Sequence, residues 1–437
     1  MNDVLANSDG RDAGSSSSAG GVALSSPSRD GEVKLRIGDT VRRWCFESIG
    51  PRLKAVVLTG SLARNEATWR QSEHGMQFLS DAEFIVILND REEIPSPEIV
   101  TLICRGAEEE LRNQGVLCKL SFGAVHEAFL LNLGETIFGH ELLTCGEVLY
   151  GDPDILLSKA RYLAHVNEED AWRMLANRTI ELLEIVPELL DGPASLSEAA
   201  QYRLTKLYCD MATSILVFKQ EFVAGYQARA DKLCRLYENG LLFDLPFDAD
   251  WFVDLVRRCT DYKIAHFWDG AAPFTALASV HQAVAVLRSL WTWELAQLHG
   301  VTMSSPDAML RLHMRKQNLK ERLRGWAFVV RRRGVFHSLS YCWRWLRLLR
   351  FASPRYCVYA AGLNAVSSFE LSVSDGTKQQ SITSSGIGQL TTDNRQLATL
   401  LHWLPVANSF ARSATDAKDV AKAILWNYQE FLVETRA

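Results

Sequence analysis

Two acidic residues at the start of an apolar run are the strongest candidates for chemistry in this sequence. Asp81 and Glu83 enter the run Phe84–Leu88, which predicts a buried strand. Residues two apart on a strand point to the same face, so both carboxylates lie side by side. Such a pair repels unless a cation lies between them. It suits Mg²⁺, which commonly takes one or two carboxylates together with substrate phosphates.

A glycine–serine pair supplies the complementary half of the predicted site. Gly60 and Ser61 follow the apolar run Ala55–Leu58, and Leu62–Arg64 then begins a predicted helix. Glycine lets the backbone approach a ligand closely, and N–H groups at a helix start bind phosphate. Arg64 is a candidate for neutralising phosphate charge from its position alone, and a solvent-exposed Arg64 is the competing interpretation. The order of elements predicts a metal–triphosphate site.

Each half of this pattern is common by itself, and the order between two apolar strands makes the combination specific. At these residues the chain resembles the nucleotidyltransferase superfamily of DNA polymerase beta, bacterial type. The matching positions are Gly60, Ser61, Asp81 and Glu83. The resemblance implies that the Gly-Ser turn holds the triphosphate and that the carboxylates bind two Mg²⁺ ions. It also implies a nucleoside triphosphate substrate, with ATP favoured. The segment Asn65–Leu79 is longer than in compact members, and we expect a helix and an extra loop there.

A third carboxylate is not found where the resemblance implies one. The predicted third strand, Val116–Val125, carries Lys119 at that position, with Ser121 two residues further on. Three hypotheses remain open. The enzyme works with two carboxylates, or Glu127 or another acid fills the position, or the domain binds nucleotide without turnover.

A second stretch also resembles bacterial members of the superfamily, at the end of their nucleotidyltransferase domain. It is the pattern Glu-Leu-x-x-x-Gly-x-Val-Leu-Tyr-Gly-Asp, from Glu141 to Asp152. We interpret Glu141 as a cap or salt-bridge partner rather than a catalytic group. The predicted strand Glu147–Tyr150 lies within this stretch, and the domain is expected to end near Leu157.

Helical periodicity dominates the rest of the chain. Helices are predicted before the first strand and after the Asp-x-Glu strand, at Lys34–Ser48 and Pro97–Gln114. After Ser158 the strand-like alternation disappears, and Ser195 with Glu198 forms a candidate capping box. The remaining predicted helices are Asp170–Leu190, Ser197–Phe222, Gln227–Asn239, Ala249–Lys263, Pro273–Leu298, Gln396–Pro405 and Thr415–Glu434. In the resembling superfamily such a bundle contacts the base or acceptor. Core or solvated roles compete with that function for the candidates Lys206, Tyr208 and Tyr226.

A basic, aromatic-rich segment stands out in the C-terminal third. Between Arg311 and Arg355 the only acid is Glu321, among many arginines and lysines. An anionic membrane surface, nucleic acid and a protein partner all fit this pattern. The alternative is a helical hairpin with a wet cationic face and an aromatic core. The polar stretch Ser367–Asn394 that follows predicts a flexible loop or weak hairpin.

Composition sets the outer limits. The chain has 437 residues, 47% hydrophobic and 23% charged, with a net charge of −5, so no global basic field argues for nucleic acid. None of its nine cysteines forms a CxxC pair, which disfavours a zinc site. Their odd number and the absence of a signal peptide favour a reducing cytoplasm. No apolar run reaches the ~18 residues of a membrane span.

The predicted fold class is α+β, with a small mixed-sheet nucleotidyltransferase domain followed by an all-helical region. The expected divisions are a disordered tail, the nucleotidyltransferase-like domain, a helical bundle and a basic helical C-terminal region, at 1–30, 31–157, 158–300 and 301–437. The leading hypothesis is Mg²⁺-dependent transfer of a nucleoside monophosphate to an acceptor hydroxyl. The alternative is a degenerate nucleotide sensor whose helical region docks a partner or membrane. The acceptor and the preferred base stay open.

Overall fold

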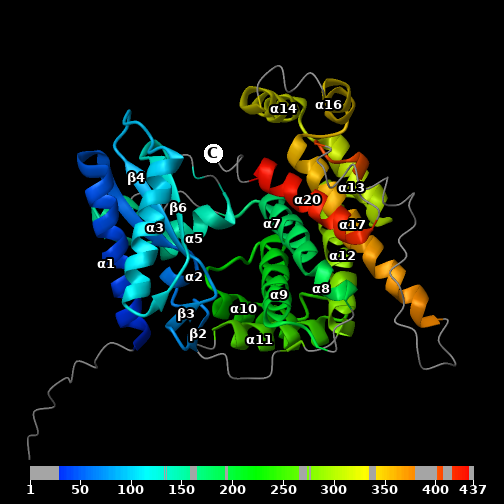
Figure 1. Ribbon diagram of the computed structural model, residues 1–437. Helices are drawn as coiled ribbons and strands as arrows, with labels where there is room; N and C mark the ends of the chain where they lie inside the picture. Colours follow the sequence, from blue (N-terminus) through cyan, green and yellow to red (C-terminus); the bar gives the residue numbers. More distant parts are fainter. Residues whose placement is uncertain are drawn as a thin grey trace, which may run out of the picture.

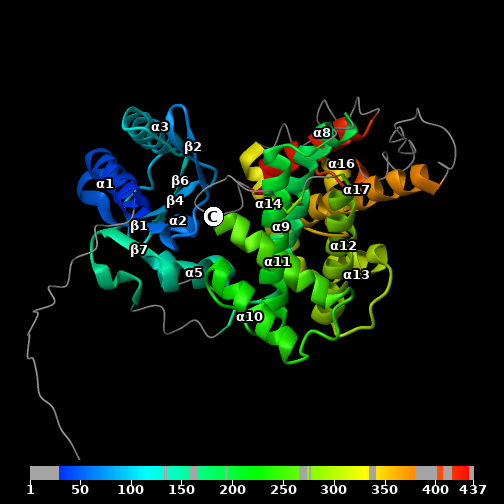
Figure 2. The same cartoon turned by 90° about the horizontal axis from the view of Figure 1, so that it is seen from below.

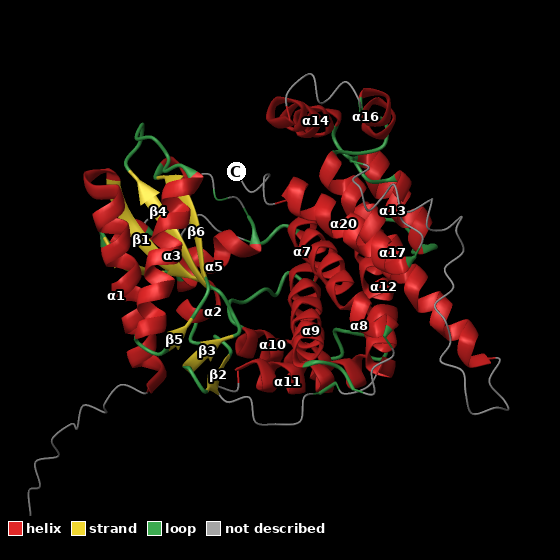
Figure 3. Ribbon diagram, in the orientation of Figure 1, coloured by secondary structure: helices red, strands yellow, loops and turns green. Residues whose placement is uncertain are grey.

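The computed structural model describes most of the chain after residue 28. The described residues are 29–131, 133, 135–157, 165–191, 195–264, 273–274, 277–333, 341–378, 401–406 and 416–432. A sheet-containing N-terminal part lies beside a much larger helical part (Figures 1 and 3). The architecture is therefore α+β, as the sequence predicts. Helix α1 (Arg29–Ile49) includes the last two residues of the expected disordered tail, and residues 1–28 lie outside the described residues.

A mixed four-stranded sheet forms the centre of the N-terminal part, in the order β6-β4-β1-β7. Its strands are β1 (Leu53–Thr59), β4 (Ala82–Leu88), β6 (Leu120–His126) and β7 (Glu147–Tyr150). The central pair β1–β4 is antiparallel, and β6 runs parallel to β4. Because both faces of the central strands are covered, their sequences are nearly continuous apolar runs.

Each face of the sheet packs against its own helices. Val56, Leu58, Phe84 and Val86 are buried in one cluster with residues of α1 and of α3 (Pro97–Asn113). The alternate strand residues are buried on the other side with α4 (Ala128–Leu131) and α5 (Ile137–Cys145). The period-2 alternation of strand side chains thus places Glu83 on the α5 face, beyond the end of its apolar layer.

The segment between Ser61 and Asp81 differs from the sequence prediction. Instead of a helix and a loop it contains an antiparallel hairpin, β2 (Trp69–Ser72) and β3 (Gly75–Phe78), after the short helix α2 (Gly60–Ala63). Strand β3 pairs in parallel with β5 (Val116–Leu117), so the predicted third strand is split into β5 and β6. The second sheet, β2-β3-β5, extends the structure below the first (Figure 3).

The rest of the described chain is helical. Predicted and observed helices agree within a few residues in α1, α3, α10, α11 and α20. The helix predicted over Asp170–Leu190 is broken before Pro187, and Ser197 rather than Ser195 caps α9, accepting from the Ala200 N–H. The bounds are α7 (Glu168–Glu181), α8 (Val186–Leu190), α9 (Glu198–Phe218), α10 (Tyr226–Glu238), α11 (Ala249–Ile264), α12 (Leu277–His299), α13 (Pro306–Lys316), α14 (Leu319–Arg333), α16 (Cys342–Leu349), α17 (Pro354–Lys378) and α20 (Ala417–Leu432). Short 3-10 turns η1 (Gly50–Arg52), η2 (Pro153–Ile155) and η3 (Leu182–Ile185) connect some of the elements.

Part of a predicted loop is helical. Helix α17 continues to Lys378, so the first part of Ser367–Asn394 is not the loop or hairpin that its polar composition suggests. Helix α17 begins in a mostly buried and mostly apolar stretch, and adding further residues is favourable once a helix has nucleated. The remainder of that segment, and most of the predicted helix Gln396–Pro405, lie outside the described residues.

One hydrophobic core joins the two predicted helical regions. Buried residues from Trp172 in α7 to Phe431 in α20 form a single cluster that crosses the expected boundary at residue 300. Trp172 packs against Tyr356 and Tyr359 of α17, with ring centroids 5.7 Å apart in each case. Among the described helices, none has the length and apolarity to cross a bilayer. All nine cysteines are free thiols.

Candidate functional site

The register of the sheet brings the glycine–serine turn against the acidic pair. Antiparallel pairing of β1 and β4 sets Thr59 opposite Glu83, so the turn that follows Thr59 lies beside this carboxylate. Gly60 has φ +70°, in the left-handed region that favours glycine. A Cβ at Gly60 would lie 2.7 Å from Glu83 Oε2, closer than such atoms approach. Glycine is favoured here by its conformation, and any other residue would also require the end of the Glu83 side chain to shift.

The two carboxylates differ in their surroundings. The Asp81 side chain is 43% exposed, and the Lys119 Nζ lies 3.7 Å from its Oδ2. Glu83 retains solvent contact at the end of the sheet. Although the Glu83 side chain is exposed at the surface, desolvation by the surrounding protein raises its pKa. The Lys206 and Arg64 cations oppose this effect, the Asp81 and Glu141 carboxylates add to it, and the net result is a raised pKa. A carboxylate that is costly to ionise gains from a bound cation.

The neighbouring strand carries neither of its polar side chains as an acid: Lys119 occupies the position where the resemblance implies a third carboxylate, and Ser121, two residues further on, lies beside Glu83. Parallel pairing of β4 and β6 sets Ser121 next to Glu83, while the Lys119 carbonyl accepts the Ala82 N–H at 2.9 Å. Lys119 is therefore level with Asp81. Glu127 follows the other end of β6, where its N–H donates to the Leu88 carbonyl. That end is five residues, roughly 16 Å, from Glu83, so the structure excludes Glu127 as a substitute.

Arg64 is not exposed to solvent but lies in a network that joins the N-terminal part to the helical bundle. Its side chain is 7% exposed and ion-paired with Glu66 at 3.0 Å and Glu141 at 2.8 Å. The second carboxylate oxygen of Glu141 pairs with Arg229 of α10, itself nearly buried. Tyr226 lies under both guanidinium groups, 5.4 Å from Arg64 and 5.5 Å from Arg229. Figure 2 shows α5 and α10 next to each other. Glu141 is thus a salt-bridge partner, as we interpret it from sequence.

Two lysines from the bundle reach toward the same end of the sheet. Lys263 of α11 is buried and donates to Thr68 Oγ1 at 2.8 Å and to Ser80 Oγ at 3.2 Å, just before Asp81. Lys206 of α9 lies close enough to Glu83 to lower its pKa. Its own pKa is lowered, first by the Arg178 cation and then by burial. Asp210 and Glu181 oppose this effect. A lysine with a perturbed pKa close to a carboxylate pair is a candidate for contacting an anionic ligand.

Two of the three residues that the sequence offered as contacts from the bundle lie at this junction. Lys206 and Tyr226 do so, whereas Tyr208 is fully buried and stacks on Phe274 with ring centroids 5.3 Å apart. Arg229 and Lys263 were not predicted. Each is one of several charged residues on its helix and lies far from the sheet in sequence, so only the tertiary fold brings it there.

The donor set can be compared with what a metal ion requires. Within the described parts of the chain, no three His, Cys, Asp or Glu side chains gather as a metal site would need. Asp81 and Glu83 supply two adjacent carboxylates, and the ionisation of Glu83 is disfavoured. This fits Mg²⁺, which is often held by one or two carboxylates, waters and substrate phosphates. It does not fit a closed site with four protein ligands.

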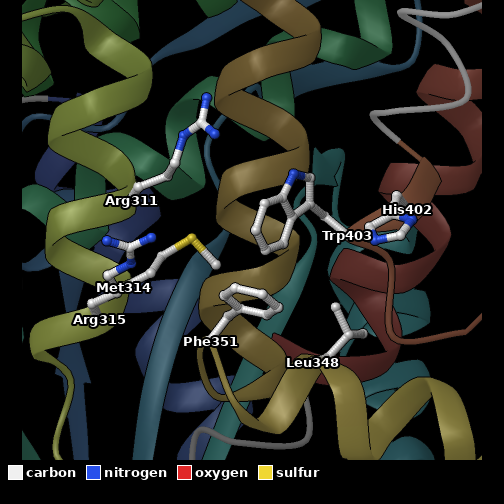
Figure 4. Close-up of a pocket in the computed structure, with 7 residues that line it drawn as sticks. All are labelled: Arg311, Met314, Arg315, Leu348, Phe351, His402 and Trp403. Atoms are coloured by element: carbon white, nitrogen blue, oxygen red, sulfur yellow. The ribbon is translucent and has the colours of Figure 1, made fainter.

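A separate cavity of about 210 Å³ lies in the C-terminal helical region. Figure 4 shows the side chains of Arg311, Met314 and Arg315 on α13 facing Phe351 and Trp403. His402 and Leu348 complete the lining. The Phe351 and Trp403 rings meet edge to face at 5.7 Å. The cavity is thus apolar with a cationic wall, and the sequence pattern indicated only its arginines.

Comparison with known proteins adds no assignment, because no family model and no curated protein matches this sequence.

Proposed function

We propose that this protein is a Mg²⁺-dependent nucleotidyltransferase whose nucleotide site lies between the Gly60-Ser61 turn and the Asp81–Glu83 pair. The observation that carries the proposal is the close approach of Glu83 to Gly60, since a Cβ at that turn would lie 2.7 Å from Glu83 Oε2 and the carboxylate would have to shift. A phosphate-binding turn and a cation-binding carboxylate pair must be adjacent to act on one triphosphate, and these two are. The acceptor remains an unidentified hydroxyl.

Each residue has a role that follows from its surroundings. The backbone N–H groups of Gly60 and Ser61 would contact the triphosphate. These N–H groups would bind phosphate by direct hydrogen bonds and not through a helix macrodipole, because α2 is only a single helical turn. Asp81 and Glu83 would bind Mg²⁺, which would neutralise phosphate charge. Lys206 would add a cation from the bundle side.

We assign Arg64 a structural role rather than the phosphate-binding role that its sequence position suggests. Its guanidinium is committed to Glu66 and Glu141, so binding phosphate would require breaking buried ion pairs. We assign it to positioning: it fixes the turn against α5 and, through Glu141, against Arg229.

A nucleotide-binding sensor without turnover is the second candidate. It is favoured by Lys119, whose ammonium lies 3.7 Å from Asp81 and provides a built-in positive charge. It is also favoured by Ser121, since the described part of β6 carries no carboxylate beside the pair. A general base for the attacking hydroxyl would then be missing.

The test is incubation of the full-length protein with each α-labelled nucleoside triphosphate, with and without Mg²⁺. Pyrophosphate release, self-labelling and calorimetric binding are the readouts. Transfer that requires Mg²⁺ and disappears in Asp81→Asn supports the enzyme. Asp39→Asn, an exposed carboxylate on α1, is the matched control and should change nothing. Absence of binding to any triphosphate would contradict both candidate functions.

A further variant separates the two candidates. If the wild type binds triphosphate without releasing pyrophosphate, and Lys119→Asp acquires release, the sensor is supported. If the wild type releases pyrophosphate, and Lys119→Asp does not raise that rate, two carboxylates suffice and the sensor hypothesis fails.

A further inference from the structure

The basic segment of the sequence is built around an ordered aromatic contact between two helices. Trp326 of α14 and Trp345 of α16 pack with ring centroids 5.7 Å apart. Their indole N–H groups donate to the carbonyls of Ala352 and Pro405, each at 2.9 Å. Both rings are nearly fully buried. These two buried tryptophans on the inward faces of α14 and α16 therefore have their packing and hydrogen-bond partners within the protein.

Two of the arginines belong to this interior. Arg322 is 8% exposed and donates to the carbonyls of Arg350 at 3.1 Å and Met314 at 3.0 Å. Arg344 donates to the Leu404 carbonyl at 2.6 Å. These guanidinium groups fasten the helices to their neighbours, so they are not available to an external anion. The interpretation of the segment as a hairpin with an aromatic core is correct for this inner side.

The outer side carries large apolar side chains next to cations. On α16, Trp343 is 84% and Leu346 55% exposed. Arg347 and Arg350 follow them at helical spacing, and both are exposed. A face with this spacing alternates apolar and cationic side chains along one stripe.

Helix α14 repeats the same combination. Leu319 is 61% and Leu323 49% exposed, and the exposed cations Lys320 and Arg324 each follow one of them. In Figure 1 both helices lie at the end of the helical part farthest from the β2–β3 hairpin. The surface is thus remote from the candidate nucleotide site.

We propose that α14 and α16 form a docking surface for an anionic phospholipid bilayer. Exposed Trp and Leu side chains insert at the headgroup boundary, while Lys and Arg side chains reach anionic headgroups. The local charge complements such a surface, since Glu321 is the only acid between Arg311 and Arg355 in a chain of net charge −5. Nucleic acid would need stacking rings along a groove, whereas three of the four large exposed apolar side chains are leucines.

The neighbouring cavity is consistent with a lipid occupant. Its lining includes Leu348 of α16 together with the aromatic rings of Phe351 and Trp403, and Arg311 and Arg315 form its cationic wall. Apolar surface and guanidinium groups side by side suit an acyl chain and its phosphate. His402 accepts a hydrogen bond from Arg347 at 2.9 Å, which connects the cavity to the exposed stripe of α16.

The test is flotation of the full-length protein with vesicles of phosphatidylcholine alone and with added phosphatidylserine. We expect binding only to the anionic vesicles, weakened by raised salt because exposed charges are screened. Arg347→Glu/Arg350→Glu should reduce the partition coefficient at least about twenty-fivefold, given roughly a fivefold contribution from each of the two cations near an anionic surface. Trp343→Ser/Leu346→Ser should reduce it tenfold or more, through lost insertion.

A matched control distinguishes docking from general stickiness. Leu241 and Phe243 are 48% and 87% exposed in the turn after α10, without a cationic stripe. Leu241→Ser/Phe243→Ser should leave flotation unchanged. Circular dichroism confirms that each variant is folded, which is expected because all substituted side chains are exposed.

Three results would overturn the proposal. They are no flotation at millimolar anionic lipid, equal binding to neutral vesicles, and flotation unaffected by both the charge and the apolar variants. Salt-sensitive binding of single-stranded RNA that is lost in Arg347→Glu/Arg350→Glu, without vesicle binding, would assign the surface to nucleic acid instead. Because the readout needs no nucleotide, it is independent of the proposed transferase activity.

Discussion

Gly60 combines a left-handed backbone conformation with a close approach to the candidate metal ligand Glu83. Gly60→Ala forces an L side chain into φ +70° and places its Cβ 2.7 Å from Glu83 Oε2. We expect a loss of about 1–3 kcal/mol in the free energy of unfolding and weaker triphosphate binding, because Glu83 must move. Urea denaturation and calorimetry measure the two effects.

A second glycine provides the control for that substitution. Gly50 has φ +65°, and a Cβ added there would meet nothing within 4 Å. Gly50→Ala should therefore incur the conformational cost alone and bind triphosphate normally. Equal binding by the two variants would show that the contact between Gly60 and Glu83 has no part in nucleotide recognition.

Glu294 on α12 is a buried acid whose protonation affects stability. It is fully buried, accepts a hydrogen bond from Ser214, and burial raises its pKa to about 8. The pKa of Glu294 is higher in the folded than in the unfolded protein, so the folded state favours the protonated carboxyl. The contribution of this group to the free energy of unfolding is therefore complete below about pH 4.5 and is lost as pH rises to about 8. The free energy of unfolding should fall across this range by at most about 1.4 kcal/mol per pH unit.

Replacement by the neutral isostere should remove that dependence. Glu294→Gln is expected to be more stable than the wild type at pH 8 and to show a flatter profile in urea denaturation from pH 5 to 8. Glu321→Gln, at an exposed site on α14, should follow the wild-type curve. A wild-type profile that is flat between pH 5 and 8 would contradict this account.

The candidate site could be read from sequence only where its parts are close in the chain. Gly60, Ser61, Asp81 and Glu83 carry a recognisable order of small, hydroxyl and acidic residues around two apolar runs. Arg229 and Lys263 carry no such signal, since cations in amphipathic helices are usually solvated. Their burial against the sheet depends on long-range packing that no local pattern encodes.

At the scale of elements, α5 is held between the glycine turn and α10 by Glu141. Glu141→Gln removes the common partner of Arg64 and Arg229 and leaves two nearly buried guanidinium groups with lost charge compensation. We expect a loss of about 3–5 kcal/mol in the free energy of unfolding. Nucleotide binding should also fall if α10 shifts away from the turn.

An ion pair elsewhere on the sheet gives the matched comparison. Glu127 pairs with Lys54, and both side chains are about one-third exposed, 33% and 34%. Glu127→Gln should cost about 0–1 kcal/mol. Thermal and urea unfolding of the two variants measure the difference, and equal costs would show that burial of the Glu141 network contributes nothing.

Elements with strong periodicity were predictable, and elements fixed by partners were not. The apolar spacing of α1 and α3 and the short run of β7 gave their ends to within a few residues. The hairpin β2–β3 was missed because Trp69–Ser72 is mostly polar and its strand state depends on pairing with β3, which in turn pairs with β5. The C-terminal half of α17 was missed for a different reason, since its polar composition resembles a turn whereas the helix propagates from the apolar stretch before it.

At the scale of the whole molecule, the helical part behaves in packing as one unit rather than two. Helix α17 lies so close to α7 that a Cβ at Gly362 would be 2.4 Å from Ile180 Cγ1. The Tyr359 hydroxyl donates to Asn177 Oδ1 at 2.9 Å. Trp172 is fully buried, and part of its cover comes from α17. Composition placed a boundary at residue 300 because the basic segment begins soon after it.

A truncation tests whether that boundary has any meaning for folding. The fragment 158–300 lacks α17 and α20, so the part of the cover of Trp172 that comes from α17 would be replaced by water. Losing the packing contacts of one large buried aromatic side chain costs about 3–5 kcal/mol. This cost is comparable with the whole free energy of unfolding of a typical domain. We expect this fragment to lack near-ultraviolet circular dichroism and cooperative urea unfolding, whereas 158–437 shows both. Cooperative unfolding of 158–300 would mean that α7–α12 form a domain of their own, onto which the C-terminal helices merely dock.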